Sequence, residues 1–293
     1  MKHEFLKIGF LTTDKKAKNK QIRNLVERLE AFGEFKAEIV RSSYLDKLPA
    51  EEWPIFDVFI PYHLDFFTID KALEYVRIRK PFLFNDLESQ AKIQDRRHIY
   101  ECLRKNGIPC LENFVYDHTD QSNPHKFEEN DDYIQTNGMR IYRPFVEKPL
   151  SARRHDINIY YSKAMGRGVR KLFRKIKNVS SQYYPGPSQV RRDGTYIYER
   201  LIDSVKDIKV YAVLDDYCYT EMRKSPNVDG VVERNAEGFE KREFCPLTYE
   251  EALIARKIIK VFKQNVCGFD IIREDEKKLN SIKKVRSSST STE

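Results

Sequence analysis

The sequence contains no long apolar run. No stretch of eighteen apolar residues occurs among its 293 residues, so we expect no membrane span. The first residues, MKHEFLKIGF, lead directly into a strand-like segment and lack the layout of a signal peptide. The five cysteines form no CxxC pair and show no histidine clustering, which argues against a thiolate metal site. We therefore expect a cytosolic protein whose thiols are reduced and mostly buried.

Two common nucleotide-related signals are also missing. The first apolar run, residues 6–12, is not followed by GxGxxG, so a dinucleotide-binding site has no support. No RNA-recognition motif or helix-turn-helix pattern is present, and the aromatic residues alternate within strands as core residues do. We therefore expect no nucleic-acid partner.

Positive charge is plentiful and unevenly distributed. The chain has a net charge of +8 and a pI of about 9.0. The segment from Arg140 to Lys209 alone holds 17 lysines and arginines against 6 acids. The rest of the chain is therefore slightly acidic. Charge alone fits any polyanionic partner: nucleic acid, which the missing motifs argue against, an anionic membrane or a phosphorylated small molecule.

The stretch KLFRKIKN, residues 171–178, concentrates this charge. Its apolar residues predict a strand or a sheet edge, while Lys171, Arg174, Lys175 and Lys177 crowd four cations together. Such cations repel one another, which suggests a ligand that they share. Lys148 and Lys209 lie in other apolar strand-like segments. Each alone would most simply face solvent, but together with Arg174 and Lys175 they predict a cleft that binds phosphate.

The first 90 residues predict an open α/β lobe. Strand patterns at 6–12, 36–41, 55–62 and 81–84 alternate with helical patterns at 19–32 and 68–79 in the order β-α-β-β-α-β. Asn19 is the predicted cap of the first helix, and Thr68 or Asp70 of the second. The segment TTDKKAKNK between the first strand and the first helix is predicted to be a basic loop.

The remaining chain predicts mainly antiparallel strands. Residues 87–106 predict one helix ended by Gly107 and Pro109, and residues 118–131 a surface loop. From 132 to 224, short turn-bounded strands dominate. A helix over 248–263, expected to bury Leu253, Ile254, Ile258 and Val261, and a strand over 268–273 follow. Residues 274–293 predict a disordered tail.

Asp270 and His155 are candidates for polar chemistry. Asp270 lies among apolar residues in CGFDIIR, which predicts a buried carboxylate that either binds a divalent metal or pairs with an arginine. His155 follows Arg153 and Arg154, which should lower its proton affinity. It is either a surface residue or a neutral donor to phosphate oxygens.

Two backbone segments have open alternatives. Gly166 and Gly168 let the backbone approach a ligand closely and could hold phosphate, or they could form a plain hairpin turn. The strand YIYERLID, residues 196–203, could present backbone groups to adenine, with Asp207 accepting from ribose. It could equally be an ordinary strand end.

Long runs of the sequence resemble one known family. PFVEKPLSARRHDINIYY, LFRKIKNVSSQYYP, TYIYERL, DIKVYAVLDDYCYTEMRKSPNVDGVVER and FKQNVCGFDIIR are similar to the kinase half of the diphosphoinositol pentakisphosphate kinases. The resemblance covers about residues 6–273. It implies an ATP-grasp fold, of mixed α/β and α+β class, with an N-terminal α/β lobe over 1–90. The core over 91–273 would clamp ATP between antiparallel sheets and be incomplete at its C-terminal end.

The resemblance implies ATP and Mg²⁺ as cofactors and inositol hexakisphosphate and diphosphoinositol phosphates as substrates. Matching positions imply that Arg96, Lys148 and His155 contact the ATP phosphates, that Glu199 and Leu201 bind adenine, and that Asp207 binds ribose. The implied substrate contacts are Lys15, Lys16, Arg174, Lys175 and Lys209. Arg234, Arg242 and Lys209 would act near the transferred phosphoryl, and Asp270 would bind magnesium.

The chain also departs from the family pattern. Arg153 and Arg154 replace acids, and no Asp-x-Asn strand follows residue 273 to complete the magnesium site; Asp275 is too close to Asp270 to replace it. Three hypotheses follow: an active inositol-phosphate kinase, an inositol-phosphate binding module that lacks one metal ligand, or a basic nucleic-acid binder, which the missing motifs argue against.

Overall fold

The structure is a computed structural model that describes residues 5–62, 66–120, 122 and 127–274. The chain divides into two compact units, which are described separately. Unit 1 comprises Met1–Ile93 with Ile259–Val266, and unit 2 comprises Gln94–Ile258 with Cys267–Glu293. The boundaries expected at residues 90 and 273 stay predictions. Asp275 and nearly all of the predicted tail lie outside the described residues.

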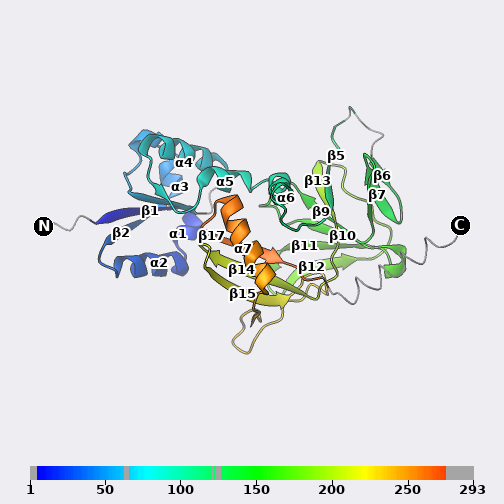
Figure 1. Ribbon diagram of the computed structural model, residues 1–293. Helices are drawn as coiled ribbons and strands as arrows, with labels where there is room; N and C mark the ends of the chain where they lie inside the picture. The colour runs from blue at the N-terminus through cyan, green and yellow to red at the C-terminus, as the bar shows by residue number, and fades with distance from the viewer. Residues whose placement is uncertain (1–4, 63–65, 121, 123–126, 275–293) are drawn as a thin grey trace. The chain divides into compact units, whose positions relative to one another are not determined.

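Unit 1 is built on a parallel four-stranded sheet. Its strands are β1 (Leu6–Thr12), β2 (Phe35–Arg41), β3 (Val58–Tyr62) and β4 (Phe82–Leu83), in the order β2-β1-β3-β4. Its helices are α1 (Asp14–Ala17), α2 (Lys20–Glu30), α3 (Ser42–Leu45), a 3-10 turn (Ala50–Glu52), α4 (Phe66–Arg79) and α5 (Leu87–Lys92). Figure 1 shows α2 on one side of this sheet and α3 and α4 on the other. The predicted α/β lobe is thus confirmed.

The predicted N-cap of the first long helix, Asn19, is confirmed. Asn19 precedes α2, and its side-chain oxygen accepts from the Gln21 N–H at 2.9 Å. Two details were wrong. The basic segment before α2 contains the short helix α1, which carries Lys15 and Lys16. The second helix, α4, starts at Phe66, so neither Thr68 nor Asp70 caps it.

The single helix predicted over 87–106 is two helices, α5 and α6 (Arg96–Lys105). Asp86 caps α5 by accepting from the Ser89 N–H at 2.8 Å. Asp95 caps α6 by accepting from the Arg97 N–H, also at 2.8 Å. Because a capping carboxylate satisfies amides that have no intrahelical partner, Asp95 starts a new helix instead of continuing the old one.

Unit 2 contains a six-stranded antiparallel sheet, as the short turn-bounded strands predicted. Its order is β12-β11-β10-β9-β13-β5. The strands are β5 (Asn113–Asp117), β9 (Phe145–Pro149), β10 (Ile157–Tyr160), β11 (Val169–Ile176), β12 (Val179–Tyr184) and β13 (Thr195–Arg200). KLFRKIKN forms most of β11, between β10 and β12, and is therefore an interior strand rather than an edge. A 3-10 turn (Lys163–Met165) and positive φ at Gly166 and Gly168 form the β10–β11 connection.

Two smaller sheets complete unit 2. The order β6-β7-β8 joins β6 (Phe127–Glu129), β7 (Tyr133–Thr136) and β8 (Met139–Tyr142), so the predicted loop over 118–131 includes a strand. The order β16-β15-β14-β17 joins β14 (Lys206–Val213), β15 (Tyr217–Lys224), β16 (Glu243–Phe244) and β17 (Val266–Ile271). The second of these sheets carries three predicted site residues: Asp207 and Lys209 on β14, and Asp270 on β17.

Some burial predictions need correction. The helix predicted over 248–263 is α7 (Tyr249–Phe262), but it buries Ala255, Ile259 and Phe262, while Leu253 is 44% exposed. The five thiols are free, yet only Cys245 is buried, and Cys218 is exposed. Within the described residues, no helix is both long enough and apolar enough to cross a membrane.

Candidate active site

Lys148 and Glu199 form a pair on neighbouring strands β9 and β13. The Lys148 ammonium makes an ion pair with the Glu199 carboxylate, which is only 2% exposed. The Tyr100 hydroxyl from α6 donates to the same carboxylate, and burial together with that negative charge raises the pKa of Tyr100. Leu201, just after β13, donates its N–H to Pro144 O at 3.3 Å. The side chain of Glu199 therefore orients Lys148, which the sequence did not predict.

Arg96, the first residue of α6, holds the segment between β9 and β10. Its Nη1 donates to Pro149 O and Ser151 O, both at 2.5 Å, and its Nη2 donates to Arg154 O at 3.1 Å. Burial lowers the pKa of Arg96. The predicted phosphate contact of Arg96 stays untested, but in this structure the side chain fixes the segment that leads to His155.

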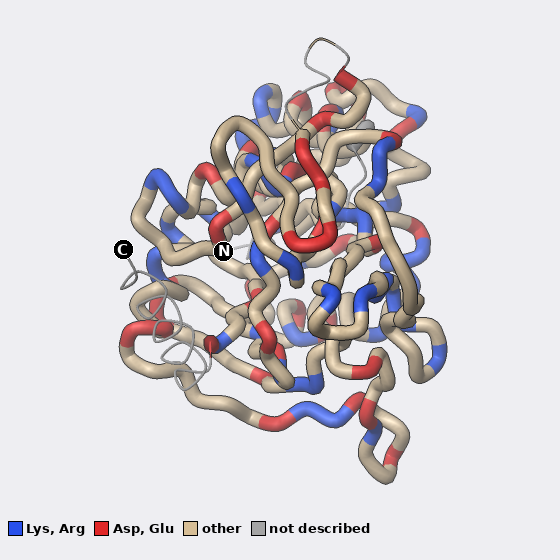
Figure 2. The backbone as a smooth tube through the Cα atoms, turned by 90° about the vertical axis from the view of Figure 1, so that its right-hand side faces the viewer, with Lys and Arg blue, Asp and Glu red and all other residues tan. Residues whose placement is uncertain are grey.

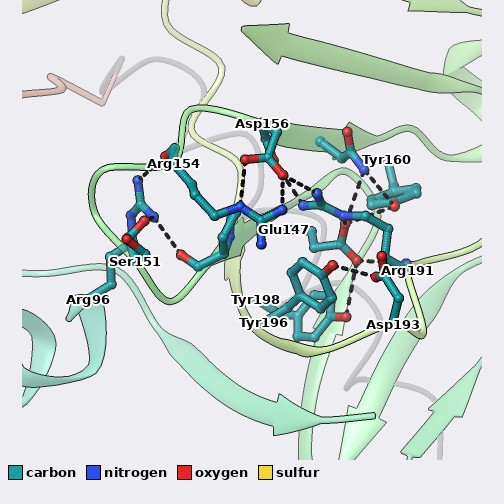
Figure 3. A network of polar contacts seen from close by, with 12 residues as sticks. Arg96, Glu147, Ser151, Arg154, Asp156, Tyr160, Arg191, Asp193, Tyr196 and Tyr198 are labelled. Atoms are coloured by element: carbon teal, nitrogen blue, oxygen red, sulfur yellow. Dashed lines mark hydrogen bonds and ion pairs between the residues drawn. The ribbon is translucent and has the colours of Figure 1, made fainter. Parts of the chain in front are cut away.

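The same segment is fixed from the other side by a buried polar network (Figure 3). Glu147 on β9 is fully buried and accepts from Arg191 Nε at 2.7 Å. Tyr160 and Tyr198 donate their hydroxyls to Glu147, each at 3.1 Å. Arg191 in turn donates to the Asp156 carboxylate at 2.7 Å and to Asp156 O at 3.0 Å. His155 thus lies in a segment fixed at both ends.

His155 has a lowered pKa, in the direction that the sequence indicated. The cause is burial first, followed by the charges of Arg174 and Arg96. The expected causes, Arg153 and Arg154, are not the cations that act on it. A neutral imidazole at pH 7 remains compatible with donation to a phosphate oxygen.

A second group of charges gathers on and beside the β14–β15 hairpin. We call it the charged cluster, and it consists of Lys175, Asp207, Lys209, Glu221, Arg223, Glu240, Arg242 and Asp270. Glu240 joins Lys175 and Arg242, each at 3.0 Å, and lies 4.0 Å from Arg223. Arg242 also donates to Glu221 at 2.5 Å. Lys209 contacts Asp270 at 3.4 Å. The cluster thus brings together five of the predicted site residues: Lys175 on β11, Asp207 and Lys209 on β14, Asp270 on β17 and Arg242 before β16.

The charged cluster is not the purely cationic surface that the sequence suggested. Its four cations stand among four acids, three of which are already within ion-pair distance of a cation. Figure 2 shows the same mixing more widely, with basic and acidic positions interspersed along the backbone. Sequence reasoning missed Glu221, Arg223 and Glu240, because a spacing rule does not show which charged side chains face one another.

Asp270 is more exposed than predicted. Its side chain is 51% exposed, and its partner is Lys209 rather than an arginine. Asp207 on the adjacent strand β14 has a raised pKa, chiefly because it is buried and also because of the Asp270 charge. No cluster of three or more potential metal-binding side chains occurs within the described ranges. One or two carboxylates still fit magnesium, because Mg²⁺ is commonly held by that number together with substrate phosphates.

Other predicted residues are engaged elsewhere. Arg234 donates to Lys177 O at 3.0 Å, to Gly238 O at 2.6 Å and to Asn178 Oδ1 at 2.6 Å. Arg174 donates to Arg153 O at 3.4 Å. Lys15 and Lys16 lie on α1 of unit 1, and their predicted contact with substrate stays a prediction.

One cavity of about 200 Å³ lies in unit 2. Its walls are Val205, Lys206, Met222, Arg223, Lys224, Val228, Glu233, Lys241 and Glu243. The cations expected to share a cleft, Lys148, Arg174, Lys175 and Lys209, do not line it. Lys175 and Lys209 meet in the charged cluster instead, while Lys148 pairs with Glu199.

Comparison with known proteins relates this chain to a group of kinases. Residues 6–95 match the family model described as the diphosphoinositol pentakisphosphate kinase 2 N-terminal domain. The inositol hexakisphosphate and diphosphoinositol-pentakisphosphate kinase VIP1 of Arabidopsis thaliana is 40% identical over 93% of this chain. Kinase 2 of that name from Homo sapiens is 41% identical over 91%. The chain is related to the inositol hexakisphosphate and diphosphoinositol-pentakisphosphate kinases. The resemblance stated from the sequence is confirmed.

The match covers only part of these kinases. The chain spans 26% of the Arabidopsis protein and 22% of the human one. The Saccharomyces cerevisiae kinase of the same name is 36% identical over 91% of this chain, which spans 25% of it. Activity and substrates of the whole relatives therefore enter only as proposals for this chain.

Solved structures define the fold. The ATP-grasp ligase PsnB, with minimal precursor, Mg and ADP, has a TM-score of 0.55 at 11% identity, covering 92% of this chain and 85% of that one. D-alanine–D-alanine ligase from Bacillus anthracis, complexed with ATP, has a TM-score of 0.52 at 13% identity, covering 92% and 82%. The predicted ATP-grasp fold is confirmed.

Proposed function

We propose that this chain is an ATP-dependent kinase that phosphorylates inositol hexakisphosphate and 5-diphosphoinositol pentakisphosphate. The observation that carries the proposal is the 36–41% identity to kinases of that name over more than nine-tenths of the chain. The ATP-grasp fold supports it, because solved neighbours with this fold hold ATP or ADP.

ATP would bind along β9 and β13. Lys148 is 23% exposed and held by Glu199, so its ammonium is oriented in advance for a phosphate. Arg96 and His155 would contact the phosphates, Glu199 and Leu201 would bind adenine through their backbone groups, and Asp207 would bind ribose. The network around Arg191 would keep the His155 segment in place for that contact.

The inositol phosphate would bind at the charged cluster and its neighbours. Inositol hexakisphosphate carries about a dozen negative charges, at roughly two per phosphate monoester near neutral pH. The contacts proposed within unit 2 are Arg174, Lys175 and Lys209, with Arg234 and Arg242 near the transferred phosphoryl. Lys15 and Lys16 of unit 1 are proposed as substrate contacts from their matching sequence positions alone. Arginine and lysine suit this role because they bind phosphate with charge-assisted hydrogen bonds.

Asp270 would hold Mg²⁺ together with ATP phosphate oxygens. When bound, the ion would neutralise charge on the transferred phosphoryl. Lys209 lies 3.4 Å from Asp270 and would place its ammonium at the same phosphoryl. The acceptor is a phosphate oxygen that is already anionic, so the protein needs to position the reactants and stabilise charge rather than remove a proton.

The direct test incubates the chain with ATP, Mg²⁺ and inositol hexakisphosphate and resolves the products by charge. A more phosphorylated inositol supports the kinase. Binding without product would support the alternative, an inositol-phosphate binding module, and absence of binding would reject both.

Replacement of one lysine tests the proposed roles. Lys209→Ala should reduce turnover by about 100-fold or more, because it removes a positive charge from the reacting phosphoryl. Lys206→Ala is the matched control, since Lys206 lies on the same strand but pairs with Glu243 at 2.8 Å. Both variants should keep the wild-type circular dichroism spectrum. Equal activity in Lys209→Ala and wild type would refute the assigned role.

A further inference from the structure

Glu240 stands among three cations that come from separate parts of unit 2. Its carboxylate lies 3.0 Å from Lys175 on β11, 3.0 Å from Arg242 before β16, and 4.0 Å from Arg223 on β15. The side chain is only 15% exposed. Lys175 and Arg242 are two of the cations proposed to bind the inositol phosphate. An internal anion therefore occupies part of the surface assigned to the ligand.

The backbone that carries Glu240 is fixed independently of these contacts. Residues 233–241 form a tight hairpin in which Asn235 N donates to Phe239 O and Lys241 N donates to Glu233 O, both at 2.8 Å. Arg234 ties the hairpin to the β11–β12 turn through Lys177 O and Asn178 Oδ1. Because the main chain is held by these bonds, the Glu240 side chain can rotate away without unfolding the segment.

The charge on Glu240 is maintained by its neighbours. Burial alone would raise its pKa, but Lys175 and Arg242, with a further contribution from Arg223, lower it. The side chain is therefore a carboxylate at neutral pH. A carboxylate amid three cations resembles a bound phosphate in charge and in hydrogen-bonding oxygens. Unlike a phosphate ligand, it cannot leave the protein.

We propose that Glu240 acts as an internal substitute for a ligand phosphate, and that a phosphorylated ligand binds Lys175 and Arg242 only by displacing it. The inference rests on the proposed function for the identity of that ligand. Displacement costs the same ion pairs for every anion, so only a ligand with many phosphates compensates for it. Glu240 thus weakens the binding of every anion to the cluster, and only a ligand with many phosphates still binds there.

The experiment measures dissociation constants by isothermal titration calorimetry for wild type and Glu240→Gln. The probes are inositol hexakisphosphate and inorganic tripolyphosphate. Glutamine keeps the shape but removes the charge, so both probes should bind Glu240→Gln about tenfold more tightly, since a like charge at the contact is lost. Unchanged or weaker binding would overturn the inference and would show that Glu240 instead positions the cations through its ion pairs.

Glu243→Gln is the matched control. Glu243 lies three residues further on and pairs with Lys206 and Lys241, outside the charged cluster. Its affinity for both probes should stay within about twofold of wild type. If Glu240→Gln fails to fold, Glu240→Asp replaces it. Its shorter carboxylate reaches fewer of the cations, so it should also tighten binding, by less. Failure of the replacement variant to tighten binding would equally overturn the inference.

The two probes separate this inference from the proposed function. If wild type does not bind inositol hexakisphosphate but Glu240→Gln gains affinity for tripolyphosphate, the proposed substrate is wrong and the role of Glu240 stands. If wild type phosphorylates inositol hexakisphosphate and Glu240→Gln binds neither probe more tightly, the proposed function stands and the role of Glu240 is wrong. If neither variant binds either probe, both proposals fail.

Discussion

Arg191 is the residue on which the buried network of unit 2 depends. It supplies the positive charge opposite the fully buried Glu147 and also binds Asp156. Removal of one partner from a buried ion pair leaves a charge without compensation. Arg191→Met should therefore lower the free energy of unfolding by about 3 kcal/mol, measured as a lower midpoint of urea unfolding followed by circular dichroism.

The adjacent arginine provides the comparison. Arg192 pairs with Glu129 at 2.8 Å, but its side chain is 52% exposed. Exposed pairs contribute little, so Arg192→Met should cost less than about 1 kcal/mol. Equal losses in the two variants would show that burial of Glu147 does not decide the effect.

Individual site residues were predicted with uneven success. The sequence indicated a lowered pKa for His155 because of neighbouring arginines. In the fold, burial is the first cause, and the arginines that add to it are Arg174 and Arg96, which are distant in the sequence. Asp270 looked buried because its sequence neighbours are apolar. On a strand, alternate residues face opposite sides, and Asp270 points to the exposed one.

Among the elements, α5 and α6 show what a periodicity argument misses. The apolar spacing over 87–106 is compatible with one helix, yet Asp95 begins a second one.

Asp95→Ala should lower the free energy of unfolding by about 1 kcal/mol through loss of the N-cap. Glu101→Ala on the exposed part of α6 is the control and should change it by less than about 0.5 kcal/mol. Thermal unfolding of both variants measures the difference, and equal stability would mean that Asp95 is not needed to start α6.

The strands that the sequence missed lack an apolar signal. β6 is FEE and β12 is VSSQYY, so each is mostly polar and joins a sheet because its backbone pairs with a neighbouring strand. The parallel sheet of unit 1 was predictable because its strands are apolar and alternate with helices. Pairing partners depend on residues that are far apart in the chain, which a local pattern does not reveal.

At the scale of the whole molecule, the charge balance should govern how fast polyanions bind. The net charge is +8, although acids compensate the cations inside the charged cluster. Long-range attraction depends on net charge and is screened by salt. The association rate of inositol hexakisphosphate should therefore fall about tenfold or more between about 50 mM and about 300 mM KCl. Surface plasmon resonance with immobilised inositol hexakisphosphate measures it, and a constant rate would exclude electrostatic steering.

Gly230 determines how closely two segments of unit 2 approach each other. Its φ is +79°, and a Cβ at this position would overlap Ser181 O on β12. The hydrogen bond from Ser180 N to Gly230 O, at 2.8 Å, brings the two segments together there. Any larger residue would push the 226–242 segment away from the β11–β12 hairpin and change the reach of Glu240 to Lys175. The affinity of the charged cluster for its ligand would then depend on the close backbone contact at Gly230, which involves no charged group.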